Sequence, residues 1–373
     1  MSSANGRPAR NRVEDSLDYP LGKRRPAAAE TIEIAAGVHW LRMPLHFQLD
    51  HINLWLLEDG DGYAIVDTGL QLDETKELWL TIFRRFGIAH GGKAGKPVTR
   101  LIVTHFHPDH IGLAGWLNDL LDTELWITRT EWLMARMLYL DSDAVNHRSM
   151  ADFYALHGLA PELADRMFSG GNTYRRRVAE APFHHRRLCA GDVLEIGGRR
   201  WEIIVGTGHA PEHACLWCAG DDILISGDQI LPKITPNISV WASEPDASPL
   251  EDYLGSFANF AGLPDDALVL PSHNLPFRGV QTRIGQIVDH HRVRLERLSG
   301  GFADGSPDGS PDDSGRARLS AADAVPLLFR RELDTHQMGF AMGECLAHLA
   351  YLEGEGTLTG RLDPDGIHRF ERT

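Results

Sequence analysis

The chain has 373 residues, of which 52 are Asp or Glu and 37 are Lys or Arg, giving a net charge of −15. This length predicts a large buried core and two domains, and the acidic charge disfavours broad attraction to nucleic acid or anionic membranes. No apolar run approaches the about 20 residues of a membrane-spanning helix, and the four cysteines are too few for a disulfide framework. We therefore expect a cytoplasmic protein.

The N-terminal segment carries Arg, Lys, Pro and Ser and lacks the apolar run of a secretory signal. Its composition predicts a mildly basic, disordered tail over residues 1–31, with a short targeting role left open. The first folded domain is expected over residues 32–280.

The most informative segment is residues 104–110, Thr-His-Phe-His-Pro-Asp-His. It follows a β-branched run that predicts a buried strand at residues 98–103, and it precedes helical spacing at residues 111–117. Four side chains on this turn are ligand types for zinc and similar divalent ions: His105, His107, Asp109 and His110. Because burying them without a cation would be costly, they predict half of a two-metal hydrolytic site. A polar surface loop is the alternative.

Residues 126–185 contain two segments with helical spacing, 131–138 and 149–157, and a break at residues 170–172. We expect this helical insertion to overhang the site. Its Met, Trp, Tyr and His residues fit a pocket for an acyl chain or an aromatic group, but they also fit plain core, and both interpretations stay open. The individual candidate contacts are Tyr154, His157 and Tyr174.

Three further ligand candidates follow along the chain: His209, Asp228 and His273. Each lies just past a short apolar run that predicts a strand. A single His after a strand is usually incidental, but three residues with the same placement predict that all of them meet the histidine turn at one edge of a layered sheet structure.

Cys215 and Cys218 have the spacing of a metal or redox pair, but they lie in an apolar run that predicts a strand. Since side chains three apart on a strand point to opposite faces, core packing is favoured for both. His213, at the start of this run, is interpreted as structural rather than as a ligand. Lys233 lies in a Pro-marked loop after Asp228, where a solvated surface position is favoured over contact with an anionic substrate group.

A second domain is predicted over residues 281–373. Its expected elements are helices at 281–298, 319–333 and 335–353, a mobile Gly-, Ser-, Pro- and Asp-rich loop at 299–315, and a two-stranded wing at 356–370. The domain contains about 11 Lys and Arg against about 15 Asp and Glu, which disfavours duplex binding. Packing over the site or dimer contact is the preferred role.

With these motifs in order, residues 32–280 resemble the metallo-β-lactamase superfamily and, within it, the glyoxalase II-like hydrolases. The resemblance implies an α+β fold, an αββα sandwich with a helical insertion at 126–185. The tail resembles the small winged-helix domain that one branch of this superfamily carries at its C-terminus.

The resemblance also implies a role for each candidate residue. It assigns one metal ion to His105, His107 and His209, the other to Asp109, His110 and His273, and a bridging position to Asp228. Asp67, in an early Asp-Thr-Gly turn, would support the histidine loop, with helix capping as the alternative.

Departures from the family narrow the function. Members that use a Cys at the position of Asp228 to cleave β-lactams are not matched, which disfavours an antibiotic-resistance role, and the basic substrate-binding residues of glyoxalase II have no clear counterpart. We expect hydrolysis of a thioester or related carboxylic ester on coenzyme A, an acyl carrier or glutathione. The alternative is an endoribonuclease or phosphodiesterase of the same superfamily, and a non-catalytic metal-binding interaction protein ranks third.

The expected cofactors are two divalent metal ions, with zinc favoured and iron or manganese tolerated, because the ligand set offers nitrogen and oxygen but no thiolate. Two such ions lower the pKa of a shared water toward about 7, so that hydroxide can attack a polarised carbonyl. Asp109 and Asp228 are the candidate catalytic residues. The expected partner is a small-molecule acyl substrate, with nucleic acid disfavoured and homo-oligomerisation left open.

Overall fold

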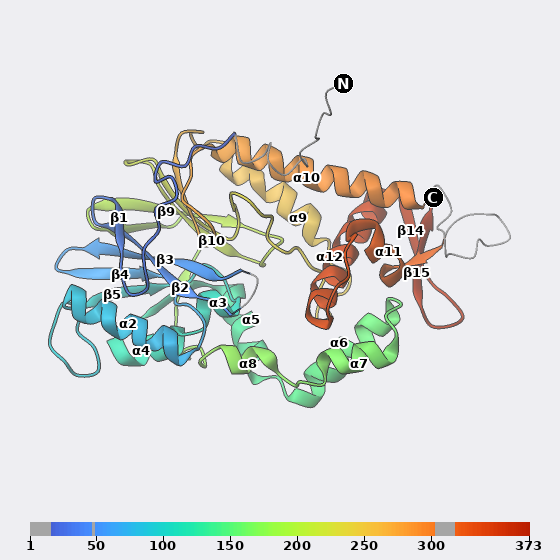
Figure 1. Cartoon of the computed structure of the whole chain (residues 1–373), viewed down its shortest axis with the longest axis horizontal. Helices are drawn as coiled ribbons and strands as arrows, with labels where there is room; N and C mark the ends of the chain where they lie inside the picture. Colours follow the sequence, from blue (N-terminus) through green and yellow to red (C-terminus); the bar gives the residue numbers. More distant parts are fainter. Residues whose placement is uncertain (1–15, 47–48, 303–317) are drawn as a thin grey trace, which may run out of the picture.

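A computed structural model describes residues 16–46, 49–302 and 318–373. Two β-sheets lie face to face, and helices cover the outer face of each (Figure 1). The order of layers is therefore helix, sheet, sheet, helix, as predicted for an αββα sandwich.

The first sheet has seven strands in the order β1-β2-β3-β4-β5-β6-β7. Its first four strands pair antiparallel, and β4 to β7 pair parallel. The strands are β1 Ile32–Ala35, β2 Val38–Pro44, β3 His51–Asp59, β4 Gly62–Val66, β5 Val98–Ile102, β6 Leu125–Thr128 and β7 Arg186–Leu188. The buried strand predicted at residues 98–103 is thus confirmed as β5.

The second sheet has five strands in the order β12-β11-β10-β9-β8. Its strands are β8 Val193–Ile196, β9 Arg199–Gly206, β10 His213–Cys218, β11 Ile223–Gly227 and β12 Leu268–Pro271. Only β11 and β12 pair parallel in this sheet. As a result, β11 and β12 deliver the residues that follow them to the same edge.

Strand alternation assigns side chains to separate cores. On β10, Cys215 packs in the cluster between the second sheet and its outer helices, whereas Ala214, Leu216 and Cys218 pack in the core between the two sheets. Both cysteines are fully buried. The interpretation of these residues as core, on opposite faces of one strand, agrees with this packing.

The helices between residues 73 and 260 fall into three groups. The first group covers the first sheet and consists of α2 Asp73–Phe86, α3 Pro108–Ile111 and α4 Ala114–Leu121. The second group forms the insertion and consists of α5 Arg129–Leu140, α6 Asp143–Leu156, α7 Pro161–Phe168 and α8 Thr173–Arg177. The third group lies on the second sheet and consists of α9 Pro249–Ser256 and the 3₁₀ turn Phe257–Phe260. The helices predicted at 131–138 and 149–157 correspond to α5 and α6, although α6 begins six residues earlier than predicted and ends one residue earlier.

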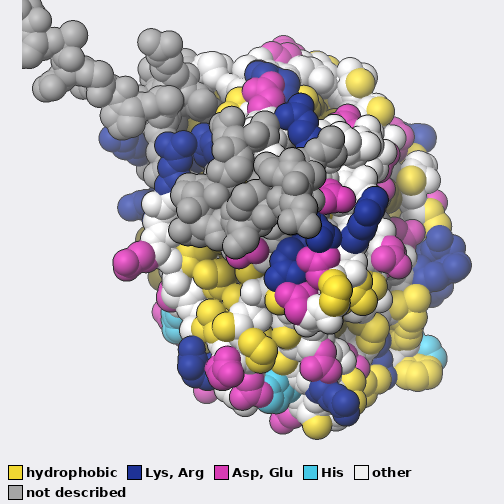
Figure 2. Space-filling view, turned by 90° about the vertical axis from the view of Figure 1, so that its right-hand side faces the viewer, with side chains coloured by type: hydrophobic (Ala, Val, Ile, Leu, Met, Phe, Trp, Pro, Cys, Tyr) yellow, Lys and Arg dark blue, Asp and Glu magenta, His cyan; other side chains and the backbone are white. Residues whose placement is uncertain are grey.

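The C-terminal unit contains α10 Val280–Gly301, α11 Ala321–Leu328 and α12 Thr335–Gly354, with a three-stranded sheet of β13 Leu319–Ser320, β15 His368–Arg372 and β14 Leu358–Leu362. The predicted pair of terminal strands is therefore present, while the winged-helix description and the domain boundaries stay predictions. Positive and negative side chains are interspersed over the visible surface of this end of the molecule (Figure 2).

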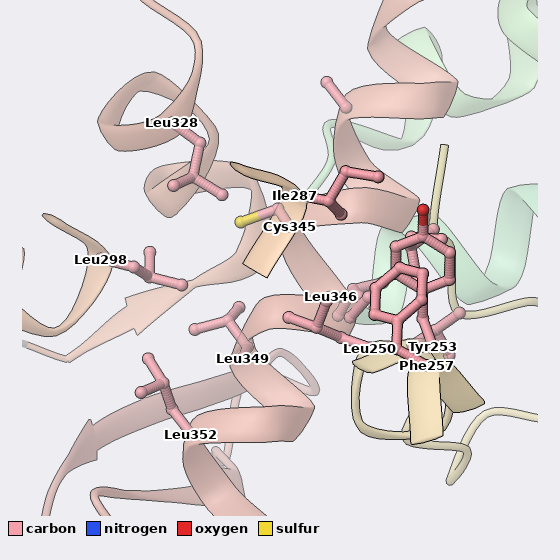
Figure 3. Close-up of a cluster of buried hydrophobic side chains, with 14 of the residues drawn as sticks. Leu250, Tyr253, Phe257, Ile287, Leu298, Leu328, Cys345, Leu346, Leu349 and Leu352 are labelled. Atoms are coloured by element: carbon pink, nitrogen blue, oxygen red, sulfur yellow. The ribbon is translucent and has the colours of Figure 1, made fainter. Parts of the chain in front are cut away.

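One hydrophobic cluster joins the C-terminal unit to the rest of the chain. Ile287 and Leu298 of α10, Leu346 of α12 and Leu250 and Tyr253 of α9 are all buried in it (Figure 3). Side chains of α6 and α7 belong to the same cluster. The C-terminal unit consequently packs as a layer of the fold and not as a separate appendage.

Three predictions need correction. Residues 16–31 were assigned to a disordered tail, but Leu17 is buried and the backbone of Asp18 pairs with Arg278; residues 1–15 lie outside the described part. The helix predicted at 319–333 is shorter, because Leu319 pairs with Phe370 in a strand and Ser320 caps α11. Most of the loop predicted at 299–315 also lies outside the described residues, and residues 299–301 are helical.

Within the described residues, no helix combines the length and apolar character needed to cross a membrane.

The packing of β10 yields a test. Because Cys215 and Cys218 fill separate cores, Cys215→Ala and Cys218→Ala should each lower the free energy of unfolding by about 1 kcal/mol, the effect of losing one buried methylene-sized group. Denaturant unfolding measures this change. Elemental analysis should show the same metal content in both variants as in wild type, and loss of metal would contradict the assignment to core.

Candidate metal centre

Three imidazoles form one cluster at the edge shared by the two sheets. His105 and His107 follow β5, and His209 lies in the turn between β9 and β10. His107 Nδ1 is 2.9 Å from His105 Nε2 and 3.1 Å from His209 Nε2. The ligand atoms of these residues lie within 4.8 Å of one another, so the three could hold one cation.

A second cluster lies beside the first. Asp109, His110 and His273 have their ligand atoms within 4.8 Å of one another, with His273 Nε2 3.4 Å from Asp109 Oδ2. Asp228, directly after β11, lies between the clusters: its Oδ2 is 3.5 Å from His209 Nε2 and 3.6 Å from His110 Nε2. The fold thus brings all seven sequence-predicted residues together.

In three of the histidines, the outer ring nitrogen, Nδ1, which points away from the centre, lies within hydrogen-bond distance of an acceptor. Nδ1 of His209 donates to the carbonyl of Asn237 at 2.8 Å, and Nδ1 of His273 donates to the carbonyl of His51 at 2.9 Å. Nδ1 of His110 is 2.8 Å from Asp67 Oδ2. Because the outer nitrogen carries the proton in each bond to a carbonyl, Nε2 of His209 and of His273 is the ring nitrogen that faces the centre, where it could bind a cation.

Asp67 supports the histidine loop instead of capping a helix. Its carboxylate accepts from the backbone N–H of Thr104 at 2.8 Å, from the Thr104 hydroxyl and from His110. The residue has φ of 62°, an uncommon conformation for a side chain other than glycine. This conformation turns the chain after β4 so that the carboxylate lies under the loop.

His213 holds the backbone of Asp228. Its Nε2 accepts the N–H of Asp228 at 3.1 Å, so this nitrogen is occupied and does not face the centre. Gly227 has φ of 54°, and a Cβ there would lie 2.4 Å from the His213 ring. Only glycine therefore permits this approach, and the interpretation of His213 as a structural residue agrees with the geometry.

Two residues that the sequence analysis did not assign to this role fix the histidine turn. Glu131, fully buried on α5, accepts from the backbone N–H of Phe106 at 2.9 Å and of Glu212 at 2.7 Å. The Tyr174 hydroxyl donates to the carbonyl of Phe106 at 2.6 Å. Two helices of the insertion thus bind both the N–H and the carbonyl of Phe106, the residue between His105 and His107.

Charge at the centre is unevenly distributed. Burial lowers the pKa of His105 and His107 well below the usual value, so both are neutral at pH 7. Burial would raise the pKa of Asp109, but His110 and His273 outweigh this effect and lower it to about 2. Asp228 and Asp109 raise the pKa of His273 to about 10 against the effect of burial.

The donor set fits divalent cations. His110 Nε2 and Asp228 Oδ1 are buried and make no hydrogen bond within residues 16–46, 49–302 and 318–373. Such atoms are costly unless another group satisfies them. Neutral imidazoles together with ionised carboxylates are the ligands that zinc and similar ions take.

Other candidates lie apart from the seven. Lys233 is exposed, and its ammonium group lies 5.7 Å from the centre of the Tyr19 ring, in agreement with a surface position. The Tyr154 hydroxyl donates to the carbonyl of Gly339 in α12, and the His157 ring packs against Phe153 and His368. Of the candidate contacts in the insertion, only Tyr174 reaches the histidine turn by a hydrogen bond among the described residues.

Glu131→Ala tests the support of the turn. It leaves two buried N–H groups without their acceptor and should lower the free energy of unfolding by about 2–4 kcal/mol and also reduce metal occupancy. Thermal or denaturant unfolding and elemental analysis measure these effects. As a control, Glu180→Ala removes a surface ion pair with Arg136 and should change stability by about 1 kcal/mol or less. Equal effects of the two substitutions would contradict the role of Glu131.

Comparison with known proteins gives a consistent picture. The sequence matches the Metallo-beta-lactamase superfamily over residues 48–273, more than half of the chain, and the family described as Metallo-beta-lactamase-like, C-terminal domain over residues 314–373. Among relatives, "Probable metallo-hydrolase YqjP" of Bacillus subtilis is 23% identical, with 88% of this chain and 96% of that protein covered. "Acyl-coenzyme A thioesterase MBLAC2" of Bos taurus is 24% identical, with 64% and 78% covered.

Solved structures support the same conclusion. A beta-lactamase domain protein from Burkholderia ambifaria is 43% identical, with 97% of this chain and all of that chain covered and a TM-score of 0.85. A metallo-beta-lactamase family protein from Thermus thermophilus is 26% identical, with 91% of this chain and 100% of that chain covered and a TM-score of 0.73. Family membership and the His and Asp clusters indicate divalent-metal binding. The chain belongs to the metallo-β-lactamase superfamily and is a metal-dependent hydrolase.

Proposed function

We propose that this hydrolase cleaves thioesters or related carboxylic esters of acyl groups, using two divalent metal ions. Zinc is the favoured metal, with iron or manganese tolerated. One ion would be held by His105, His107 and His209 and the other by Asp109, His110 and His273, with Asp228 as the bridge.

The position of Asp228 is the observation that carries the dinuclear proposal. Its Oδ2 lies within 3.6 Å of one imidazole from each cluster, and its Oδ1 lies 3.3 Å from His273 Nε2. A carboxylate with two oxygens can serve two cations, whereas a thiolate at this position would not offer two separate ligand atoms.

Bound divalent ions would supply a water with a lowered pKa and would polarise the substrate carbonyl. The protein's own groups would then orient the attacking water and accept its proton. The carboxylate of Asp109, which lies beside His273 and His110, can orient an attacking water and accept its proton. Asp109 is also the more exposed of the two acids, at 21% against 10% for Asp228.

The acyl thioester is favoured on two grounds. A relative of 24% identity carries the name acyl-coenzyme A thioesterase, and the ligand set has no Cys at the position of Asp228. An RNA substrate is disfavoured because the C-terminal unit mixes charges of both signs over its visible surface (Figure 2). The proposed partner is thus a small acyl substrate, in a cytoplasmic setting, with homo-oligomerisation left open.

Asp228→Asn tests the bridge. Wild-type protein that has never met a chelator should contain two metal ions per chain by elemental analysis, whereas the variant should lose at least one of them and roughly 100-fold or more in turnover, because the anionic bridge is gone. Asp222→Asn, in the turn before the same strand, is the control and should behave as wild type. Full activity and full metal content in Asp228→Asn would overturn the assignment.

A substrate panel tests the reaction. Purified protein should hydrolyse at least one of a series of acyl-coenzyme A, acyl-glutathione and lactone substrates, and it should bind single-stranded RNA weakly at about 150 mM salt. Release of free thiol measures thioester hydrolysis, release of acid measures lactone hydrolysis, and filter binding measures RNA binding. Tight, salt-sensitive RNA binding together with no hydrolysis of any thioester would reverse the preference between ester and RNA.

A further inference from the structure

We infer that the C-terminal unit positions the metal centre, by holding the loop of residues 229–240 that begins directly after Asp228 and supplies the acceptor for His209. This inference rests on the ligand roles of His209 and Asp228 proposed above. The unit would then determine metal affinity, although none of the seven candidate ligands lies in it.

The first contact is at Asn237. Its carbonyl accepts the Nδ1 proton of His209 at 2.8 Å, so the position of this peptide sets the direction of the His209 ring. The Asn237 side chain donates to the carbonyl of Phe340 on α12 at 3.4 Å and accepts from Ser239 at 2.5 Å. The acceptor for a candidate ligand is therefore tied to a helix that begins about a hundred residues further along the chain.

Close packing of helix and loop is the second contact. The N–H of Val240 donates to the carbonyl of Gly343 at 3.2 Å. A Cβ on Gly343 would lie 2.6 Å from Ser239 Oγ and 2.8 Å from Ser239 Cβ, so the loop approaches α12 as closely as a glycine allows. Ile238 and Val240 are buried in the same cluster as Ala341. The loop and α12 are consequently in direct contact through both backbone and side chains.

Charged groups fix α12 and the early part of the loop. Glu344 on α12 pairs with Arg294 on α10 at 2.9 Å, and both side chains are largely buried. Burial raises the pKa of Glu344, while Arg294 and Asn237 oppose the rise. Arg283 on α10 donates to the carbonyls of Leu231 and Ile234. Two helices of the C-terminal unit thus bind the loop at positions 231, 234, 237 and 240.

Metal affinity of three variants tests the inference. Gly343→Ala adds the Cβ that Ser239 excludes, and Asn237→Ala removes the side-chain contacts while keeping the carbonyl that His209 uses. Gly339→Ala is the matched control, one turn earlier on α12, where an added Cβ meets only the end of Met167 at 3.5 Å. Affinity for zinc is measured in the full-length protein by competition with a chelator, and cobalt-loaded protein is examined for its visible absorption bands.

We expect Gly343→Ala and Asn237→Ala to bind zinc about tenfold or more weakly, the usual size of an outer-contact effect, and to alter the cobalt spectrum, whereas Gly339→Ala matches wild type. A lower melting temperature with unchanged zinc affinity and unchanged cobalt bands in both variants would overturn the inference, since it would leave the contacts purely structural. Should Gly343→Ala fail to fold, Asn237→Ala decides alone.

His209→Ala separates this inference from the proposed function. Normal zinc affinity in His209→Ala would overturn the ligand assignment and, with it, the inference. Weakened affinity in His209→Ala with wild-type affinity in Gly343→Ala and Asn237→Ala would overturn the inference alone. Neither readout depends on which acyl substrate the enzyme takes.

Discussion

The site depends on one constraint: five imidazoles and two carboxylates share a largely buried edge, and each must keep one orientation there. Buried polar groups are tolerable only when their hydrogen-bonding capacity is used. The protein meets this requirement from outside the cluster, where carbonyls and Asp67 bind the outer nitrogens of three rings. The inner nitrogens and carboxylate oxygens then converge, and a bound cation would satisfy the polar atoms that the protein leaves without a partner.

Backbone hydrogen bonds between the two sheets also help to fix the orientation of these residues. At the site, the N–H of Ala214 donates to the carbonyl of Thr104 at 2.9 Å, and the N–H of Asn53 donates to the carbonyl of Ser272 at 2.6 Å. Each bond connects a strand of one sheet to a strand end of the other. Because each cluster takes candidate ligands from both sheets, a shift between the sheets would move His209 away from His105 and His107, and His273 away from Asp109 and His110. The αββα arrangement is therefore part of the metal centre and not merely its scaffold.

Sequence reasoning reached the parts of this site that depend on local chemistry, since the histidine turn gathers its ligand types within six residues and each later ligand follows an apolar run. Glu131 and Tyr174 carry no such signal, because their partners are backbone groups and a backbone group has no sequence signature. In residues 16–31 the low apolar content conceals anchoring side chains such as Leu17, which is 7% exposed. At residues 319–333 helical spacing outweighed a stronger local signal, the capping box that begins α11. In both segments, a few specific contacts determined the structure, although the overall composition or spacing of the segment predicted something else.

The contacts between the insertion and the C-terminal unit also depend on backbone acceptors, which here lie on α12. On one turn, α12 accepts the hydroxyl proton of Tyr154 from α6, and on the next it accepts the N–H of Val240 from the loop that supports His209. The insertion and the loop beside the metal centre therefore share one helix as their common support. Because α5 and α8 of the same insertion also hold the histidine turn, a displacement of α12 would disturb the centre from two directions. The orientation of His209 and the packing of the insertion consequently cannot vary independently in this fold.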